Sequence, residues 1–326
     1  MTTFVSFVCG HMFSASTLTG FVHGSRDPAI VLDELFCFSP SAFPAPRRYE
    51  NPLPEFGSAF KTARLITNLT DLEHIKTREG DNKFVVCAGL PWLLPASLIS
   101  RLTQEVASPS GTRAFQRALV GAHPSLLPQG RGQSPVQWTL LEGAVASGVS
   151  SFILSDGLDD GPLLAQAPIK LSRNETATTL FKKVRIGHET VGRALANSLP
   201  GNLTGIPQAD AAELPRPQRR ASQGYICPTS SAADIVRLVR AHQHPYSRAF
   251  ILLGSHLHFV RSARIWTEDH VPPGTTRTAG SRRVFLGCRD GTLLLTLEQP
   301  HMQSDPVRVL PKDITKRKGA KDAGWC

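Results

Sequence analysis

Residues 83–89 read Lys-Phe-Val-Val-Cys-Ala-Gly, and this run is the clearest structural signal in the chain. It is apolar, rich in β-branched residues and closed by glycine, which is typical of a buried strand. Residues 95–102 follow with apolar side chains at helical spacing. A buried strand followed by a helix is the repeating unit of a parallel sheet covered by helices.

The same alternation extends over the first 160 residues. Short apolar runs predict further strands at residues 4–10, 29–32, 35–38 and 118–121. Helical spacing returns over residues 176–195. We therefore predict an α/β fold, a Rossmann-like and mostly parallel sheet with helices on both faces.

The second half of the chain has a different pattern. Residues 199–220 are rich in proline and lack periodicity, which predicts a linker between two domains. Beyond it, an amphipathic helix is predicted at residues 232–241, and short alternating runs follow at 249–253, 257–263, 283–287 and 292–297. These runs predict a small β-barrel. The predicted boundaries are 1–205 for the first domain, 206–311 for the barrel and 312–326 for a basic, flexible tail.

The net charge of +10 is unevenly distributed along the 326 residues. Residues 1–205 hold 18 Lys and Arg against 16 Asp and Glu, whereas the remaining residues hold 18 against 10. A basic second half indicates an anionic partner, such as a phosphate-bearing acceptor or an RNA backbone. An ordinary solvated basic surface is the alternative explanation.

The cellular context is inferred from cysteines and apolar runs. The six cysteines lack the spacing of a metal site, so we expect reduced thiols and no bound metal. The first 20 residues lack the positive start of a signal peptide. No apolar run approaches the roughly 18 residues of a membrane span. We expect a cytoplasmic protein that does not enter the membrane.

Residues 121–166 carry the candidate chemistry. His123 directly follows a predicted strand, and in open α/β sheets ligands bind at the carboxyl ends of strands. A histidine there can exchange protons near neutral pH. Asp159 lies in an acidic turn between Gly157 and Gly161, and an aspartate beside a histidine stabilises the imidazolium. On residue types alone, a structural histidine and a solvated acidic loop are the more common explanations.

Taken together, the motifs of this region resemble the folate-dependent formyltransferase family. They occur in the family's order: Cys87–Pro95, His123-Pro124-Ser125-Leu126-Leu127-Pro128, Gly130-Arg131-Gly132, Pro135–Trp138 and Asp159-Asp160-Gly161. The second half resembles the C-terminal module of the methionyl-tRNA and amino-sugar formyltransferases, which implies that the small barrel is open and OB-like. The residues that carry this second resemblance are Arg219-Arg220, Gly224-Tyr225-Ile226, Ile235–Ala241 and Pro245–Phe250.

The resemblance implies 10-formyltetrahydrofolate as the formyl donor and an amine as the acceptor. It implies that His123 and Asp159 are catalytic residues of a formyltransferase domain, with no need for a metal. It also implies that the folate lies against two short segments, Pro91-Trp92-Leu93-Leu94 and Ser155-Asp156.

Gly121 departs from the family pattern. The family has an asparagine two residues before the histidine, where its amide donates a hydrogen bond to the developing oxyanion. Losing one such donor costs about 100- to 1000-fold in rate when nothing replaces it. We count Gly121 as the third catalytic position. We expect protonated His123, a backbone N–H or a water to replace the missing donor.

Three functions remain open. The first is formyl transfer to a nucleotide-linked amino sugar or a similar small amine, and we expect this acceptor to carry phosphate. The second is formylation of initiator methionyl-tRNA, which the basic second half favours, although residues 40–54 offer only Arg47 and Arg48 where a basic insertion is expected. The third is a folate-binding homologue that lost turnover, suggested by Gly121. A homodimer is a candidate assembly for any of them.

Overall fold

The computed structural model describes residues 2–10, 12–42, 51–77, 80–88, 90, 93–209 and 214–298. The predicted tail at 312–326, Pro91, Trp92, Arg47 and Arg48 lie outside these residues. The chain forms two compact units. Unit 1 comprises Met1–Pro135, Ala146–Lys170 and Lys182–Arg216, and unit 2 comprises Val136–Val145, Leu171–Phe181 and Pro217–Cys326. The contiguous boundaries at 205 and 311 stay a prediction.

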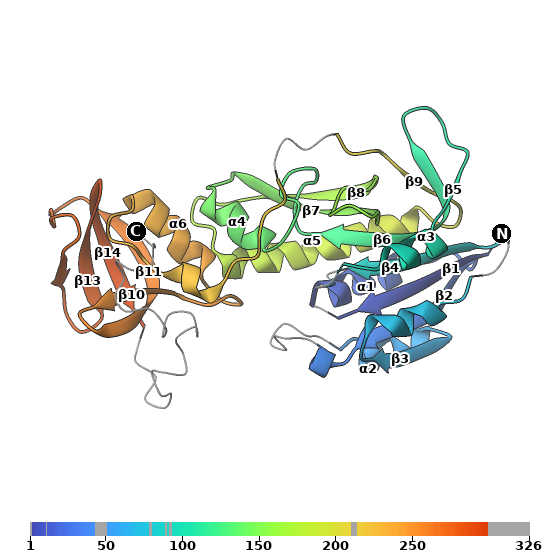
Figure 1. The fold of residues 1–326 in the computed structure, drawn as a ribbon, viewed down its shortest axis with the longest axis horizontal. Coiled ribbons are helices and arrows are strands. Elements are labelled where there is room, and N and C mark those ends of the chain that lie inside the picture. The colour runs from blue at the N-terminus through green and yellow to red at the C-terminus, as the bar shows by residue number, and fades with distance from the viewer. Residues whose placement is uncertain are drawn as a thin grey trace. The chain divides into compact units, whose positions relative to one another are not determined.

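Unit 1 is built on one large sheet whose central strands are parallel (Figure 1). The order is β3-β2-β1-β4-β6-β7-β8, with β5 and β9 also paired to β6. The first four neighbouring pairs are parallel, whereas β7 and β8 run antiparallel to their neighbours. The predicted α/β, mostly parallel sheet is therefore confirmed. The strands are β1 Thr3–Cys9, β2 Ile30–Phe38, β3 Thr62–Ile66, β4 Asn82–Ala88, β5 Gln104–Val106, β6 Arg113–His123, β7 Ala146–Ile153, β8 Leu163–Lys170 and β9 Leu203–Gly205.

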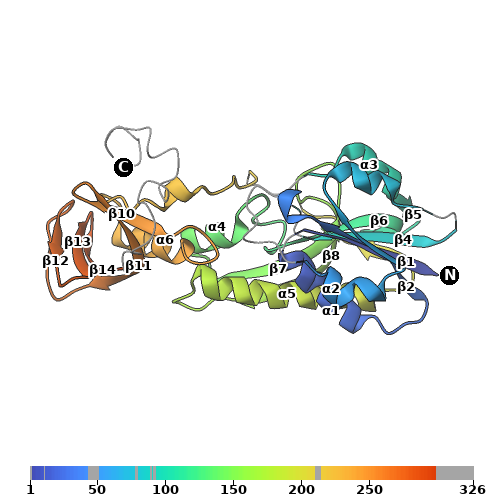
Figure 2. The same cartoon turned by 90° about the horizontal axis from the view of Figure 1, so that it is seen from below.

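Helices cover both faces of this sheet (Figure 2). The helices α1 Met12–Gly24, α2 Leu53–Phe56 and α5 Ala177–Asn197 lie on one side, and α3 Ala96–Leu102 lies on the other. The side chains agree, because Leu18, Phe56 and Leu195 join one core and Leu98 and Leu102 join another. Short 3-10 turns span Pro40–Ala42, Gly57–Ala59 and Leu69–His74. Each face of the sheet therefore has its own buried core.

Glycines let α1 and α5 approach closely. A β-carbon at Gly20 would overlap the carbonyl of Glu189, and one at Gly192 would overlap the carbonyl of Thr17. Beside this crossing, the fully buried His188 lies 3.0 Å from Thr17 Oγ1 through its Nδ1. The two helix backbones are therefore in direct contact.

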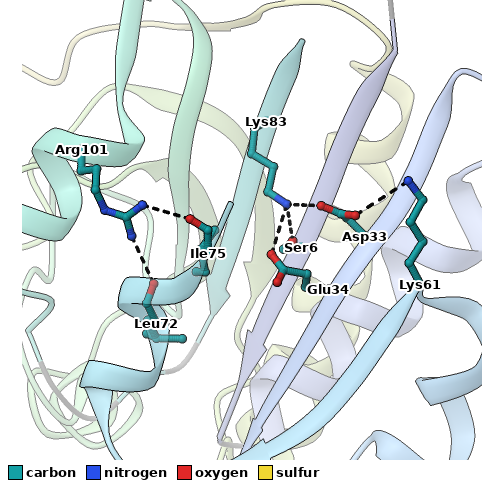
Figure 3. Close-up of polar contacts among 8 residues, drawn as sticks. All are labelled: Ser6, Asp33, Glu34, Lys61, Leu72, Ile75, Lys83 and Arg101. Carbon is teal, nitrogen blue, oxygen red and sulfur yellow. Dashed lines mark hydrogen bonds and ion pairs between the residues drawn. The ribbon is translucent and has the colours of Figure 1, made fainter. Parts of the chain in front are cut away.

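A buried ion cluster joins β1, β2 and β4 (Figure 3). Lys83 Nζ lies 2.5 Å from Asp33 Oδ2, 3.4 Å from Glu34 Oε2 and 2.8 Å from Ser6 Oγ. The Lys83 side chain is only 4% exposed. The register between β1 and β2 shifts between Val5 and Phe7. At this bulge, Asp33 and Glu34 both lie opposite a single residue of β1, so both carboxylates can reach the same ammonium.

Unit 2 contains an antiparallel sheet and one helix that packs on it. The order is β10-β11-β14-β13-β12. Helix α6 Ala232–Ala241 buries Ile235 and Val239 against Leu293 and Leu295 of the sheet. This curled antiparallel sheet is consistent with the predicted small barrel. The strands are β10 Ala249–Leu253, β11 His256–Trp266, β12 Thr276–Thr278, β13 Arg283–Cys288 and β14 Gly291–Leu297. Unit 2 also contains α4 Pro135–Leu141 from Val136 onward and the 3-10 turn Ala221–Gly224.

Two sequence predictions differ from the structure in detail. The runs at 29–32 and 35–38 form one continuous strand, β2, because the bulge keeps the chain paired to β1 across the charged residues. The run at 118–121 is only the end of the eleven-residue strand β6. Among the described residues, no helix is long and apolar enough to cross a membrane.

Candidate active site

His123 is the last residue of β6, and the loop that follows it is fixed by two polar side chains. Ser150 Oγ donates to the carbonyl of Ser125 at 2.7 Å and accepts from the N–H of Leu127 at 3.0 Å. Gln166 Nε2 donates to the carbonyl of Leu127 at 2.8 Å. Both side chains come from the antiparallel hairpin β7–β8. The residues around His123 are therefore held by strands that the sequence analysis did not predict.

The imidazole of His123 is buried and faces an oxygen on each side. Its Nε2 lies 3.0 Å from the carbonyl oxygen of Gly130, and its Nδ1 lies 3.4 Å from Asp159 Oδ2. The side chains of His123 and Asp159 are 10% and 17% exposed. A carbonyl only accepts hydrogen bonds, so the bond to Gly130 requires hydrogen on Nε2. The carboxylate of Asp159 lies close enough to stabilise the ring whenever the imidazole carries a positive charge.

Asp159 is held in a conformation that few residues adopt. Its φ is 54°, in the left-handed region that disfavours a residue with a β-carbon. Its Oδ2 also accepts the backbone N–H of Gly132 at 2.9 Å. One carboxylate oxygen therefore contacts both the ring of His123 and the loop behind it. Backbone outliers of this kind cluster at functional sites.

Gly121 lies two residues before His123, paired with Phe152 of β7. A β-carbon on Gly121 would lie 2.7 Å from Leu154 Cδ2 and 2.9 Å from Phe152 Cζ. Real β-carbons do not approach other heavy atoms this closely. The space that an amide side chain would need is filled by hydrocarbon.

The residues predicted to bind the folate are only partly described. Leu90, Leu94 and Leu154 each pack against the core that includes Leu98 and Leu102, whereas Leu93 is 73% exposed. Ser155 Oγ donates to the carboxylate of Asp160, and Asp156 is exposed in the same turn. Leu154, which directly precedes Ser155, packs against the same core as Leu94.

The structure thus brings His123, Asp159 and Gly121 to one end of β6. Among the residues that the structure describes, no group of three His, Cys, Asp or Glu side chains is placed to hold a metal ion. The sequence analysis missed Ser150 and Gln166, whose side chains bond the loop after β6. A polar residue inside an otherwise apolar strand was the available signal for Ser150 and Gln166.

Two family models match the chain in the order of its two halves. The model described as formyl transferase matches residues 76–195, and the model described as formyl transferase, C-terminal domain, matches residues 220–305. The chain belongs to the formyltransferase family. The first match includes all three candidate catalytic positions.

The curated relatives include methionyl-tRNA formyltransferases. The protein from Myxococcus xanthus is 33% identical over 182 residues, which cover 56% of this chain and 58% of the relative. The protein from Lachnospira eligens is 28% identical over 236 residues, covering 69% of this chain and 68% of that relative. The matched stretch therefore spans little more than half the length of the Myxococcus protein.

The structural neighbours share the fold at low identity. An N-formyltransferase from Helicobacter canadensis, solved with folinic acid and dTDP-3-aminofucose, has a TM-score of 0.62 at 12% identity. The match covers 92% of this chain and all of that one. HypX from Aquifex aeolicus has a TM-score of 0.57 at 15% identity, covering 98% of this chain and 49% of HypX.

Proposed function

We propose that this protein transfers a formyl group from 10-formyltetrahydrofolate to the amine of a small, phosphate-bearing acceptor, such as a nucleotide-linked amino sugar. The observation that carries the proposal is the 3.4 Å approach of His123 Nδ1 to Asp159 Oδ2 in a chain of the formyltransferase family. Residues 1–205 form the catalytic domain of the proposal, and residues 206–311 form its C-terminal domain.

The described residues fit a folate. A pterin has apolar faces and a polar edge, so it needs hydrocarbon beside fixed hydrogen-bonding groups. Leu94 and Leu154 pack against the same core, and the polar turn of Ser155 and Asp156 directly follows Leu154. These residues, with Pro91, Trp92 and Leu93, would hold the folate, which supplies the formyl carbon.

His123 manages charge and protons in this proposal. An imidazolium at this position places a positive charge where negative charge develops on the formyl oxygen as the amine attacks. The imidazolium can deliver a proton to the departing folate nitrogen, and the neutral ring that remains can then take up the proton that the attacking amine loses. Asp159 keeps the ring oriented and its charge stabilised through Nδ1.

Gly121 makes the proposal depend more heavily on His123. Phe152 and Leu154 occupy the space beside Gly121, so no side chain can donate a hydrogen bond from that position. The developing oxyanion must be stabilised by the charge of His123, a backbone N–H or a water. A protein in which these fail would bind folate without turnover, and the assay below separates that case.

The amino-sugar acceptor is supported by full-length likeness to sugar enzymes. The Helicobacter canadensis N-formyltransferase and the sugar 3N-formyltransferase WlaRD are matched over their whole length. WlaRD was solved with dTDP and 5-N-formyl-THF. A nucleotide-linked sugar carries two phosphates, which suits a chain of net charge +10.

The second candidate acceptor is initiator methionyl-tRNA. The sequence relatives favour it, as does an arginine cluster in unit 2. Arg240 Nη1 donates to the carbonyl of Arg173 at 2.7 Å. Burial first, and then the charges of Arg173 and Arg237, lower the pKa of Arg240. Crowded arginines of this kind suit an RNA backbone.

A panel assay tests the proposal. The purified full chain is incubated with 10-formyltetrahydrofolate and either dTDP-linked amino sugars or methionyl-tRNA, and the release of tetrahydrofolate is measured. We expect turnover with an amino sugar, loss of turnover in His123→Asn, and unchanged turnover in His74→Asn, whose imidazole is exposed on a 3-10 turn.

Each outcome decides between the candidates. Turnover with methionyl-tRNA alone, weakened steeply by salt, would replace the sugar with tRNA. Folate binding without turnover on any acceptor would overturn the catalytic proposal and leave a binding protein. Full activity in His123→Asn would show that the site lies elsewhere.

A further inference from the structure

Gln208 lies in the segment after β9, far from the catalytic loops in sequence but next to them in space. Ile206 and Leu163 exchange backbone hydrogen bonds, with N to O distances of 2.7 and 2.8 Å. This pairing fixes the segment against the start of β8. Two residues later, the half-buried side chain of Gln208 reaches the turn that carries Asp159.

The amide of Gln208 is fully used. Its Nε2 donates to the carbonyl of Asp159 at 3.0 Å and to the carbonyl of Gly161 at 2.8 Å. Its Oε1 accepts from Arg131 Nη2 at 2.8 Å and from Arg131 Nε at 3.3 Å. Carbonyls can only accept and a guanidinium can only donate, so the orientation of the amide is fixed by its partners.

The side-chain amide of Gln208 links the loop that contains Arg131 to the turn that contains Asp159. Arg131 lies between Gly130, whose carbonyl faces His123 Nε2, and Gly132, whose N–H binds Asp159 Oδ2. On the other side, Gln208 binds the carbonyl of Asp159 itself, the residue with the left-handed backbone. A sparsely populated conformation persists only when its surroundings hold it.

We propose that Gln208 is a positioning residue, which holds the Asp159 turn in register with the His123 loop through Arg131. The inference rests on the proposed formyl transfer. Gln208 would act only through Asp159, and this role requires no contact between Gln208 and the substrate. An apolar side chain of the same size would fill the space but release both carbonyls and the guanidinium.

Three variants separate the contacts. Gln208→Met removes all of them at similar volume. Gln208→Glu keeps the acceptor for Arg131 but loses both donors to the turn. Gln104→Met is the matched control, because Gln104 Oε1 also accepts from an arginine, Arg117, at an exposed position on β5.

We expect kcat to fall by up to about 100-fold in Gln208→Met and Gln208→Glu, since small misplacements of catalytic groups cost that much. We expect KM for the folate to change by less than about threefold, because the proposed folate residues keep their places. Gln104→Met should match the wild type in both constants.

A second measurement does not depend on turnover. The NMR signals of the His123 imidazole, assigned with His123→Asn, should move in both Gln208 variants and stay in place in Gln104→Met. If only thermal stability falls while the His123 signals and kcat hold, Gln208 is merely structural and the inference is overturned. If Gln208→Glu keeps the wild-type kcat, the hydrogen bonds from Gln208 to the carbonyls of Asp159 and Gly161 do not position the catalytic residues.

The two proposals fail in distinguishable ways. A wild type that transfers formyl to no acceptor refutes the proposed function, and the His123 signals still test the coupling to Gln208. A wild type that turns over, with Gln208 variants that also turn over normally, refutes the positioning role alone.

Discussion

His123 has an acceptor on each side of its ring, and the two acceptors come from different loops. The Gly130 carbonyl belongs to the loop after β6, whereas the Asp159 carboxylate belongs to the turn between β7 and β8. The environment of the ring therefore depends on the positions of both loops. A single substitution at Asp159 can remove its negative charge and keep the shape of the side chain, so the contribution of the charge can be measured separately.

Asp159→Asn preserves the shape and removes the charge. The amide oxygen can still accept the N–H of Gly132, so the turn should stay folded. We expect kcat/KM to fall by about 100-fold, at the low end of what a general acid–base group contributes. Steady-state assays with thermal melting as a folding control measure this, and Glu105→Gln, an exposed carboxylate change on β5, serves as the comparison. A loss below about threefold would remove Asp159 from the mechanism.

Gly121→Asn tests whether the missing amide can be restored. The new side chain would meet Leu154 and Phe152 at once, and overpacking of this kind destabilises by about 1–3 kcal/mol. Urea denaturation should show that loss, and Gly121→Asn combined with Leu154→Ala should recover part of it. Wild-type stability in the single variant would mean that the space beside Gly121 opens freely.

Strands β1, β2 and β4 show how one irregular pair can place a charge inside a sheet. The bulge in β2 turns Asp33 and Glu34 toward Lys83, and the three strands are cross-linked by one ammonium (Figure 3). Removing one member of a buried ion cluster leaves the others unpaired, which costs more than the cluster itself contributes.

Lys83→Met should therefore lower the free energy of unfolding by about 3 kcal/mol. The control is Lys61→Met, because Lys61 lies 3.9 Å from the same Asp33 but is 48% exposed, and surface pairs contribute less than about 1 kcal/mol. Urea denaturation of both variants gives the comparison. Equal losses in the two variants would contradict the role assigned to burial.

Some of the strands and helices could be predicted from the sequence, and others could not. Strands β1 and β4 were predictable because their residues are buried throughout and most of them are apolar. Strands β7 and β8 were not, since Ser147, Ser150 and Ser151 break the apolar pattern of one and Pro168 interrupts the other. Helix α4 was not predicted, because its buried residues include the polar Gln137 and Thr139 and so show no clear apolar pattern.

The candidate site divides in the same way. His123 and Asp159 were candidates because each lies in a local motif, a strand end and a glycine-bounded turn, and because the family resemblance singled them out. Gln208 could not be predicted, because its partners are 49 and 77 residues away and no local pattern records them. The apolar filling beside Gly121 likewise depends on the pairing of β6 with β7.

On the scale of the whole molecule, the two units have separate cores and need not share their sensitivity to acid. In unit 2, burial, aided by the charge of Arg219 and opposed by a hydrogen bond to the Ser247 carbonyl, lowers the pKa of His242 to about 4. His242 is therefore neutral in the folded chain near neutral pH. The unfolded chain takes up a proton below about pH 6.5, so stability is present above that pH and is lost as the pH falls toward 4.

The free energy of unfolding of unit 2 should accordingly be about 2 kcal/mol lower at pH 5 than at pH 7. His242→Asn should flatten this dependence, because its amide can still donate to the Ser247 carbonyl but does not titrate. Urea denaturation at both pH values measures the effect, and His256→Asn, an exposed change in the same unit, is the control. An unchanged pH dependence in His242→Asn would assign the acid sensitivity to other groups.

The contact between α1 and α5 affects how mutational surveys of this protein should be interpreted. Any side chain at Gly20 or Gly192 collides with the backbone of the other helix, so both positions should reject every substitution, as a catalytic residue would. In a deep mutational scan scored by cell growth, the two glycines would therefore be indistinguishable from His123. Scoring the same library for the amount of folded protein would separate them, because glycine variants disappear from that pool while His123 variants remain.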